Sequence, residues 1–219
     1  MVDAAGTILV VLTRAPSSSG KSRLFHTLNM PPDAALLRAL LLDTLDGAAL
    51  PGLRRVIAVT PASACDEVRE MAGTIDVMPQ AEGDLGDRMQ ASMETLFREG
   101  ATAVVLIGAD LPHIDAALIA EACGVLAADR DALALGPSED GGYYLIGACR
   151  VPDVFRGIEW GSDRVLASTE RAACAHGFRV HRLAALSDVD TADDLRAAVL
   201  TGRAPRVSAW VDAHLGGGR

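Results

Sequence analysis

The stretch Val104-Val-Leu-Ile107-Gly-Ala-Asp110 places four apolar residues, three of them β-branched, directly before a glycine and a carboxylate. Such a run predicts a strand that is buried on both faces. A similar run, Ile8–Leu12, lies near the start of the chain and is followed by turn residues. Two buried strands that lead into polar loops favour a parallel sheet with its chemistry at the carboxyl ends of the strands.

Apolar runs and helical patterns alternate on both sides of these strands. The spacing predicts further strands over 56–59, 75–78, 132–135, 143–148 and 178–183, and helices over 32–45, 65–71, 84–98, 116–127, 163–175 and 191–200. This order predicts a three-layer α/β/α sandwich with a mainly parallel, Rossmann-like sheet. We expect a single domain over residues 1–204. Residues 205–219 have weak periodicity and are predicted to form a loose C-terminal tail.

The composition indicates a globular chain. Of its 219 residues, 50% are hydrophobic and 22% are charged, and the formal net charge of −9 argues against a nucleic-acid partner. The four cysteines form no CxxC pair, so we expect neither a zinc site nor a disulfide framework. With no secretory signal and no apolar run that matches a membrane span, a cytoplasmic location is expected.

The loop after the first strand carries several cations and small residues. Its stretch Ala15-Pro-Ser-Ser-Ser-Gly-Lys-Ser22 is close to the phosphate-binding pattern GxxxxGK[ST], but Ala15 and Pro16 stand where that pattern begins with glycine. A P-loop fold is therefore disfavoured. A loop with Arg14, Lys21 and Arg23 still suits a triphosphate or a pyrophosphate, the alternative being a solvated basic turn.

Two acidic positions are candidate metal ligands. Asp110 follows a central strand, where a carboxylate can hold Mg²⁺ or Mn²⁺ together with phosphate oxygens. Asp188 and Asp190 precede the last predicted helix and offer a second ligand. The alternative for this acidic run is helix capping, because Thr191 and Asp194 have the spacing of a capping box.

The stretch from Gly136 to Tyr144 is dense in unusual residues. Paired glycines, Gly141 and Gly142, allow close backbone approach to a ligand, and Glu139 and Asp140 could accept hydrogen bonds from hydroxyl groups or act as a base. A tight hairpin turn is the alternative, and the spacing alone does not exclude it.

Taken together and in order, these pieces resemble the nucleotide-diphospho-sugar transferase superfamily with the GT-A fold. The branch they resemble most is the radical-SAM/selenodomain-associated, glycosyltransferase-like one. The matching segments are Thr13-Arg-Ala-Pro16 with Gly20-Lys-Ser-Arg-Leu24, Gly83-Asp-Leu-Gly-Asp-Arg-Met89, Ile107-Gly-Ala-Asp-Leu-Pro112, Gly136-Pro137 with Glu139-Asp-Gly-Gly-Tyr-Tyr-Leu-Ile-Gly147, Trp160-Gly-Ser-Asp-Arg-Val165 and Asp188-Val-Asp-Thr191.

The resemblance implies a set of roles for these segments. The nucleotide and its phosphates would be bound by Thr13, Arg14, Ala15, Gly20, Lys21, Arg23, Gly86, Arg88 and Met89. The metal, Mg²⁺ or Mn²⁺, would be held by Asp110 and Asp190, and the sugar or acceptor by Glu139, Gly141, Gly142 and Tyr143. Lys21, Asp140 and Asp110 would be catalytic.

The implied function is a nucleotide-dependent transferase. Glycosyl transfer from a nucleotide-diphospho-sugar is the first expectation. Nucleotidyl transfer of a guanylyl or cytidylyl group to a small phosphorylated acceptor is the serious alternative, because the Lys-Ser-Arg-Leu loop also resembles phospholactate guanylyltransferases. A P-loop kinase and a non-catalytic nucleotide-binding protein rank lower. The expected partners are a nucleotide or nucleotide sugar and a small acceptor, with a homodimer left open.

Overall fold

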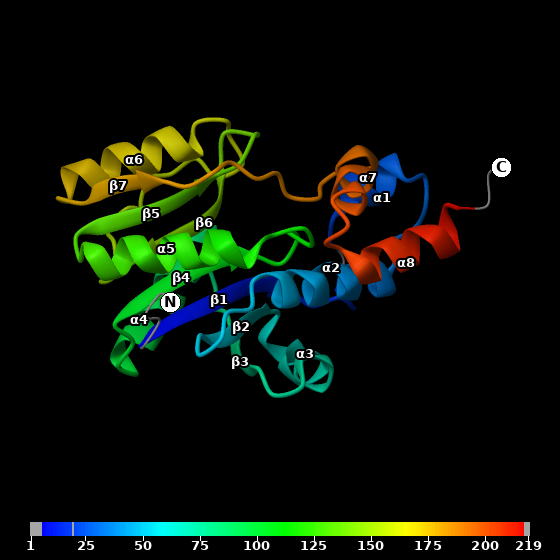
Figure 1. Ribbon diagram of the computed structural model, residues 1–219, viewed down its shortest axis with the longest axis horizontal. Helices are drawn as coiled ribbons and strands as arrows, with labels where there is room; N and C mark the ends of the chain where they lie inside the picture. The colour runs from blue at the N-terminus through cyan, green and yellow to red at the C-terminus, as the bar shows by residue number, and fades with distance from the viewer. Residues whose placement is uncertain (1–5, 19, 217–219) are drawn as a thin grey trace.

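The computed structural model describes residues 6–18 and 20–216. Figure 1 shows the elements, which are, in chain order, β1 (Thr7–Arg14), α1 (Ser22–Thr27), α2 (Ala34–Gly47), β2 (Arg54–Thr60), the 3₁₀ turn η1 (Ala62–Ala64), α3 (Cys65–Ala72), β3 (Asp76–Pro79), α4 (Leu85–Arg98), β4 (Ala103–Gly108), α5 (Ala116–Ala128), β5 (Ala132–Pro137), β6 (Tyr143–Ala148), α6 (Val165–Ala175), β7 (Arg179–Arg182), α7 (Ala192–Leu200) and α8 (Pro205–His214). Among these residues, no helix has both the length and the apolar character needed to cross a membrane.

The strands form one seven-stranded sheet with the order β3-β2-β1-β4-β6-β5-β7. Neighbouring strands are parallel except where β6 pairs with β4 and β5, so β6 runs against the rest. The sheet is therefore mainly parallel, as predicted. Because β1, β4, β5 and β7 run the same way, the loops that follow them meet at one edge of the sheet.

Side chains alternate between the two faces of each strand, and each face has its own core. Leu9 and Val11 of β1 face the layer of α2, α3 and α5, whereas Ile8 and Val10 face the layer of α4 and α6. All four side chains are less than 5% exposed. The predicted three-layer α/β/α sandwich is confirmed.

A third apolar cluster lies beyond the carboxyl edge of the sheet. It joins α1, the first half of α2, α7 and α8, and contains Phe25, Leu36, Val189, Leu195 and Trp210. Figure 1 shows these helices grouped at the end of the molecule away from β7. The prediction of a loose tail is wrong for residues 205–214, because α8 packs on α2 in this cluster. The last three residues of that tail, Gly217–Arg219, lie outside the described residues.

A buried carboxylate docks α8 on α2. The Asp43 side chain is 0% exposed and pairs with the Arg206 guanidinium at 2.9 Å. It also accepts hydrogen bonds from the backbone N–H groups of Arg206 and Val207 at 2.9 and 3.0 Å. These N–H groups belong to the first turn of α8 and have no partner within the helix. A side chain of α2 thus caps the last helix.

The turn between β5 and β6 is held by its own polar groups. The Asp140 carboxylate accepts hydrogen bonds from the Ser138 hydroxyl and, at 2.9 Å, from the Gly142 N–H. Gly141 has a φ of 87°, and its carbonyl accepts a hydrogen bond from Leu166 N at 2.9 Å. A Cβ at Gly141 would overlap the backbone carbonyl of Asp163. Only glycine therefore allows this turn to pack against the start of α6.

We predict that Asp43→Ala lowers the free energy of unfolding by about 3 kcal/mol, because it leaves two buried N–H groups without their acceptor and removes the buried partner of the Arg206 guanidinium. Urea denaturation measures the loss. Asp46→Ala is the matched control, since Asp46 pairs with the same guanidinium at 2.7 Å but is 64% exposed. Asp46→Ala should lower the free energy of unfolding by less than about 1 kcal/mol. Equal losses for the two variants would contradict the capping role of Asp43.

Gly141→Ala should destabilise the protein by about 2–4 kcal/mol, combining the left-handed backbone with the overlap at Asp163. Gly157→Ala tests the cost of the left-handed backbone alone. Gly157 has a φ of 70°, and a Cβ there would meet nothing within 4 Å. We expect a cost of about 1 kcal/mol for this control. The melting temperatures of both variants are compared by thermal unfolding. Similar decreases would show that the close approach of Gly141 to Asp163 does not contribute to stability.

Candidate functional site

A cleft of about 500 Å³ opens at the carboxyl edge of the sheet. Its walls come from the loops after β1, β4 and β5, which are the places where the sequence predicts the chemistry. The lining residues that were predicted as site residues are Thr13, Arg14, Ala15, Gly20, Lys21, Met89, Asp110, Asp140, Gly142 and Tyr143. The structure therefore brings together residues from four separate sequence segments.

Asp110 is positioned by the end of β4 and by a buried hydroxyl of α2. The Thr44 side chain is 0% exposed and lies beside the backbone around Asp110. Its hydroxyl accepts from the Leu111 N–H at 3.1 Å, and its one proton lies between the Leu40 carbonyl at 2.8 Å and the Ala109 carbonyl at 3.1 Å. Sequence reasoning missed Thr44, because a threonine inside an apolar helix carries no signal of the loop that it supports.

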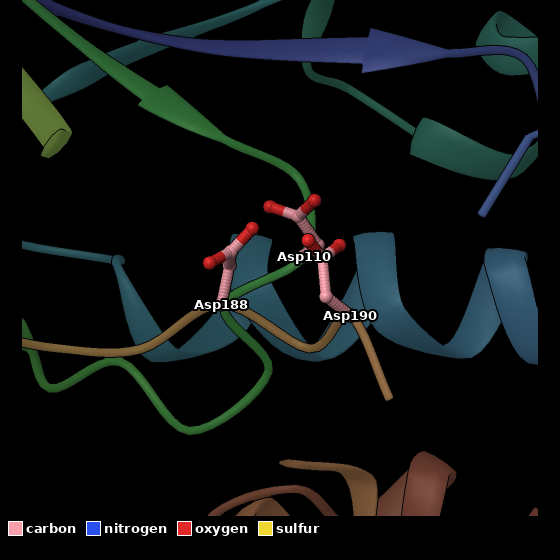
Figure 2. A group of neighbouring side chains, drawn as sticks. All are labelled: Asp110, Asp188 and Asp190. Atoms are coloured by element: carbon pink, nitrogen blue, oxygen red, sulfur yellow. The ribbon is translucent and has the colours of Figure 1, made fainter. Parts of the chain in front are cut away.

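The segment between β7 and α7 brings two more carboxylates to Asp110. The backbone N–H of Val189 donates to the Asp110 carbonyl at 3.0 Å, so Asp188 and Asp190 lie on either side of this bond. Thr191 and Asp194 then form the predicted capping box at the start of α7. Figure 2 shows the three aspartates with their carboxylates turned toward one another. The end of this run caps a helix, as predicted, and its beginning adjoins the cleft. The role of Asp188 and Asp190 as metal ligands stays a prediction.

Lys21 lies among these three carboxylates. Its Nζ is 2.5 Å from Oδ2 of Asp110, 2.5 Å from Oδ1 of Asp190 and 3.8 Å from Oδ2 of Asp188. The Lys21 side chain is only 18% exposed. Burial alone lowers the pKa of Lys21, but the charges and hydrogen bonds of Asp110 and Asp190 outweigh it and raise the pKa above its usual value. Lys21 is therefore a firmly protonated ammonium.

Crowding of negative charge changes the titration of Asp188. Its burial, followed by the charge of Asp110, raises the pKa of Asp188 to about 6, although Lys21 acts in the opposite direction. A carboxyl group with this pKa is only partly ionised in mildly acidic solution. The Lys21 ammonium therefore offsets part of the repulsion among the three carboxylates.

The three aspartates also fit a divalent metal ion. One carboxylate oxygen from each of Asp110, Asp188 and Asp190 lies within 4.8 Å of the others. Mg²⁺ and Mn²⁺ prefer such all-oxygen ligands and usually keep waters and phosphate oxygens in their remaining positions. The ammonium of Lys21 now holds the position that a small cation would take. Both Asp188 and Asp190 lie close enough to Asp110 to share one ion with it, and the choice of second ligand between them stays a prediction.

The other two cations of the first loop lie near the same place. Arg14 is exposed, lines the cleft and passes over Gly20, where a Cβ would come within 3.3 Å of the Arg14 Cδ. Arg23 is 73% exposed and lies 3.6 Å from Asp190. Ser19, in the middle of this loop, lies outside the described residues. The arrangement leaves cationic side chains facing the cleft, as a phosphate-binding loop requires.

The opposite wall of the cleft is apolar and aromatic. Tyr143 packs edge-on against Trp160, with ring centroids 6.5 Å apart, and Leu85 and Met89 lie beside them in the lining. Burial raises the pKa of Tyr143, so its phenol stays neutral. Trp160 and Leu85 were not predicted as site residues, although both lie in segments that carry the family resemblance. Leu85 is 46% exposed and adds apolar surface to this wall.

Several predicted residues lie just outside the cleft lining. Gly86 is buried under Trp160, whose Cζ2 would be 2.8 Å from a Cβ there. The Arg88 Nε donates to the Gly83 carbonyl at 3.0 Å, and Glu139 is exposed. Gly141 shapes the turn that carries Asp140. Their predicted contacts with nucleotide or acceptor stay predictions.

Asp140 is in the cleft but its carboxylate is already engaged. The hydrogen bond from the Ser138 hydroxyl lowers the pKa of Asp140, and the Gly142 N–H adds to this effect against the influence of burial. A carboxylate with a lowered pKa is a weak base. The geometry favours a role in holding the turn, and the predicted catalytic role stays untested.

Comparisons with known proteins agree with this picture. A phosphoenolpyruvate guanylyltransferase of Mycolicibacterium vanbaalenii is 32% identical over 111 residues, which are 49% of this chain and 52%, about half, of that relative. Another protein of the same name, from Mycolicibacterium gilvum, is 26% identical over 202 residues, covering 90% of this chain and 91% of the relative.

A solved structure matches nearly the whole chain. It is a protein of Desulfovibrio desulfuricans G20 provisionally described as a nucleotide-diphospho-sugar transferase, with a TM-score of 0.83 and 29% identity over 95% of this chain and 96% of that one. This match confirms the GT-A-like fold. Together the comparisons confirm the predicted enzyme class, a transferase. The names of the curated relatives fit the nucleotidyl-transfer alternative better than the glycosyl transfer that was expected first.

The family itself is identified by its sequence pattern. The family model described as "Uncharacterized protein conserved in bacteria (DUF2064)" matches residues 44–162, which run from Thr44 beside the site to the loop after Trp160. This range is more than half of the 219 residues. The chain therefore belongs to the DUF2064 family.

Proposed function

We propose that this protein is a nucleotidyltransferase that transfers a nucleoside monophosphate, with guanylyl as the first choice, from a nucleoside triphosphate to a small phosphorylated acid. The observation that carries the proposal is the grouping of Asp110, Asp188 and Asp190 around one cation position at the edge of a cleft lined by Arg14 and Lys21. The names of the two Mycolicibacterium relatives support guanylyl transfer and a phosphorylated acid as acceptor.

The proposed reaction joins two phosphates. An oxygen of the acceptor phosphate attacks the α-phosphorus of the triphosphate, the bond from that phosphorus to the bridging oxygen breaks, and pyrophosphate leaves. Mg²⁺ or Mn²⁺, held by the three aspartates, would neutralise charge on the phosphate oxygens. Arg14, Lys21 and Arg23 would bind the leaving pyrophosphate, because their positive charge stabilises the charge that develops there.

This chemistry needs no strong base. A phosphate monoester is largely ionised at neutral pH, so its oxygen attacks without losing a proton. The lowered pKa of Asp140 and its bonds within the turn are compatible with such a reaction. Asp140 would then orient the β5–β6 turn against the acceptor instead of removing a proton.

The competing functions have less support. Glycosyl transfer from a nucleotide sugar uses the same phosphate and metal groups, but the curated relatives are named for nucleotidyl transfer. A P-loop kinase would place a longer helix after Lys21, whereas α1 has six residues. The narrower resemblance to the radical-SAM/selenodomain-associated branch stays a prediction.

The direct test is a product assay. The protein is incubated with each nucleoside triphosphate, Mg²⁺ or Mn²⁺, and phosphoenolpyruvate, and pyrophosphate is measured. We expect release with GTP that requires both metal and acceptor. Nucleotide sugars are tested in parallel with the same acceptor. Release of a nucleoside diphosphate from a sugar donor, without pyrophosphate from any triphosphate, would replace this proposal with glycosyl transfer.

The carboxylate site is tested by Asp110→Asn, which should lower kcat by at least about 100-fold because it removes a charged ligand from the metal and phosphate site. Asp193→Asn is the matched control, since Asp193 belongs to the same acidic run but is 89% exposed and pairs only with Arg196 among the described residues. The control should keep its activity within about two-fold. Equal effects of the two substitutions on kcat would show that Asp110 has no role in the reaction.

Occupancy of the cleft is tested by fluorescence. The chain has two tryptophans, of which Trp160 lines the cleft and Trp210 donates to Asp33 in the outer helical cluster. GTP with Mg²⁺ should change the emission of Trp210→Phe, which keeps the cleft tryptophan. It should leave the emission of Trp160→Phe unchanged. The opposite pattern would place the nucleotide away from this cleft.

A further inference from the structure

We propose that Lys21 is a resident counter-cation of the metal site, and that it must leave the three aspartates before a divalent metal binds there. The released ammonium then moves to the phosphates of the nucleotide. Metal and nucleotide therefore bind as a coupled pair. This inference rests on the metal site of the proposed function. It gives the Lys21 ammonium two alternative positions: one among the carboxylates, and one on the phosphates, as expected from the sequence.

The geometry leaves one position for a cation. The Lys21 Nζ touches Asp110 and Asp190 at 2.5 Å each, and the third carboxylate, on Asp188, lies at 3.8 Å. A magnesium ion in contact with carboxylates lies about 2.0–2.1 Å from their oxygens. Since the ligand oxygens lie within 4.8 Å of one another, metal and ammonium would occupy nearly the same point. They cannot bind there together.

The residue type suits this exchange. Lys21 is the only lysine in the sequence, in which every other basic residue among the 20 is arginine. An ammonium is a compact charge with rotatable donors on a flexible stem, whereas a guanidinium is a rigid planar fork. A compact charge can sit among three carboxylates as a metal ion does. A flexible stem lets that charge move away.

The place to which Lys21 moves is also present. Lys21 precedes α1 and lines the cleft together with Arg14 and Gly20. Its ammonium therefore needs only side-chain rotation to reach the cleft, where a triphosphate supplies anionic oxygens. Without the nucleotide, an ammonium that leaves the carboxylates exchanges three close anions for solvent.

Coupling between metal and nucleotide follows from this exchange. A metal ion that binds alone must expel Lys21 without giving it a new partner. A triphosphate gives Lys21 that partner and adds ligands for the metal. Each ligand therefore improves the binding of the other, and the two effects are equal by thermodynamic linkage. Arg23, 3.6 Å from Asp190, compensates only part of the charge when Lys21 leaves.

The test is a titration of the nucleotide-free protein with Mn²⁺. Electron paramagnetic resonance measures the concentration of unbound Mn²⁺, which gives the dissociation constant. Lys21→Met removes the competing ammonium and keeps the length of the side chain. We expect Mn²⁺ to bind this variant at least ten-fold more tightly than the unsubstituted protein. Arg203→Met is the matched control, because it also removes one positive charge but pairs with Asp115 outside the site. Its Mn²⁺ affinity should stay within about two-fold of the unsubstituted protein.

A second measurement keeps the proposal testable if Lys21→Met folds poorly. Because the sequence has a single lysine, ¹³C labelling at lysine Cε gives one side-chain signal. The signal should move little with saturating GTP alone, and should shift to a new position when Mg²⁺ is added to the GTP-bound protein. A signal that stays in place when Mg²⁺ and GTP are both bound would overturn the proposal.

The outcomes separate this inference from the proposed function. Equal Mn²⁺ affinity of Lys21→Met and the unsubstituted protein overturns the role of Lys21, even if nucleotidyl transfer is found. Tighter binding by Lys21→Met supports that role, even if the transferred group is a sugar. If the unsubstituted protein, Lys21→Met and Arg203→Met all fail to bind Mn²⁺, the three aspartates do not form a metal site and this inference is wrong.

Discussion

The hydrogen bond from the backbone of Val189 to the carbonyl of Asp110 joins the central strand to the last part of the chain. On one side of this bond, Asp188 and Asp190 come beside Asp110. On the other side, Val189 is 0% exposed and belongs to the cluster formed by α1, α2, α7 and α8. One backbone contact thus places the carboxylates and anchors the helices that surround them.

Bringing three carboxylates together has an electrostatic cost that the chain must offset. Two unit charges about 4 Å apart repel by about 4 kcal/mol at the effective dielectric constant typical near a protein surface. The Lys21 ammonium offsets part of this repulsion, and burial together with the charge of Asp110 still raises the pKa of Asp188.

The cleft combines two chemically different walls. The wall from the loop after β1 and the end of β4 carries charges of both signs, as transfer between phosphates requires. The opposite wall, with Tyr143 and Trp160, is aromatic and offers flat apolar surface for an organic group. A substrate with a charged phosphate end and a flat or apolar end fits both walls, and a nucleotide is such a molecule.

Local patterns in the sequence determined the sheet, most of the helices and the place of Asp110 at the end of a central strand. Buried strands such as 104–107 are continuous apolar runs, and capping residues such as Thr191 mark helix starts, so short-range physics suffices for them. Helix α8 was missed because its stability comes from Asp43 and from the cluster around Trp210, and not from its own periodicity.

Only the tertiary structure decided what the site residues touch. The basic loop and the family resemblance predict a phosphate contact for Lys21, which stays a prediction. The structure adds contacts of Lys21 with Asp110 and Asp190, which are distant in sequence. Thr44 and Trp160 entered the site for the same reason, since their contacts come from the packing of α2 and α4. A sequence specifies which groups are available, but long-range packing decides which of them meet, because electrostatic and hydrogen-bond partners are chosen by distance in space.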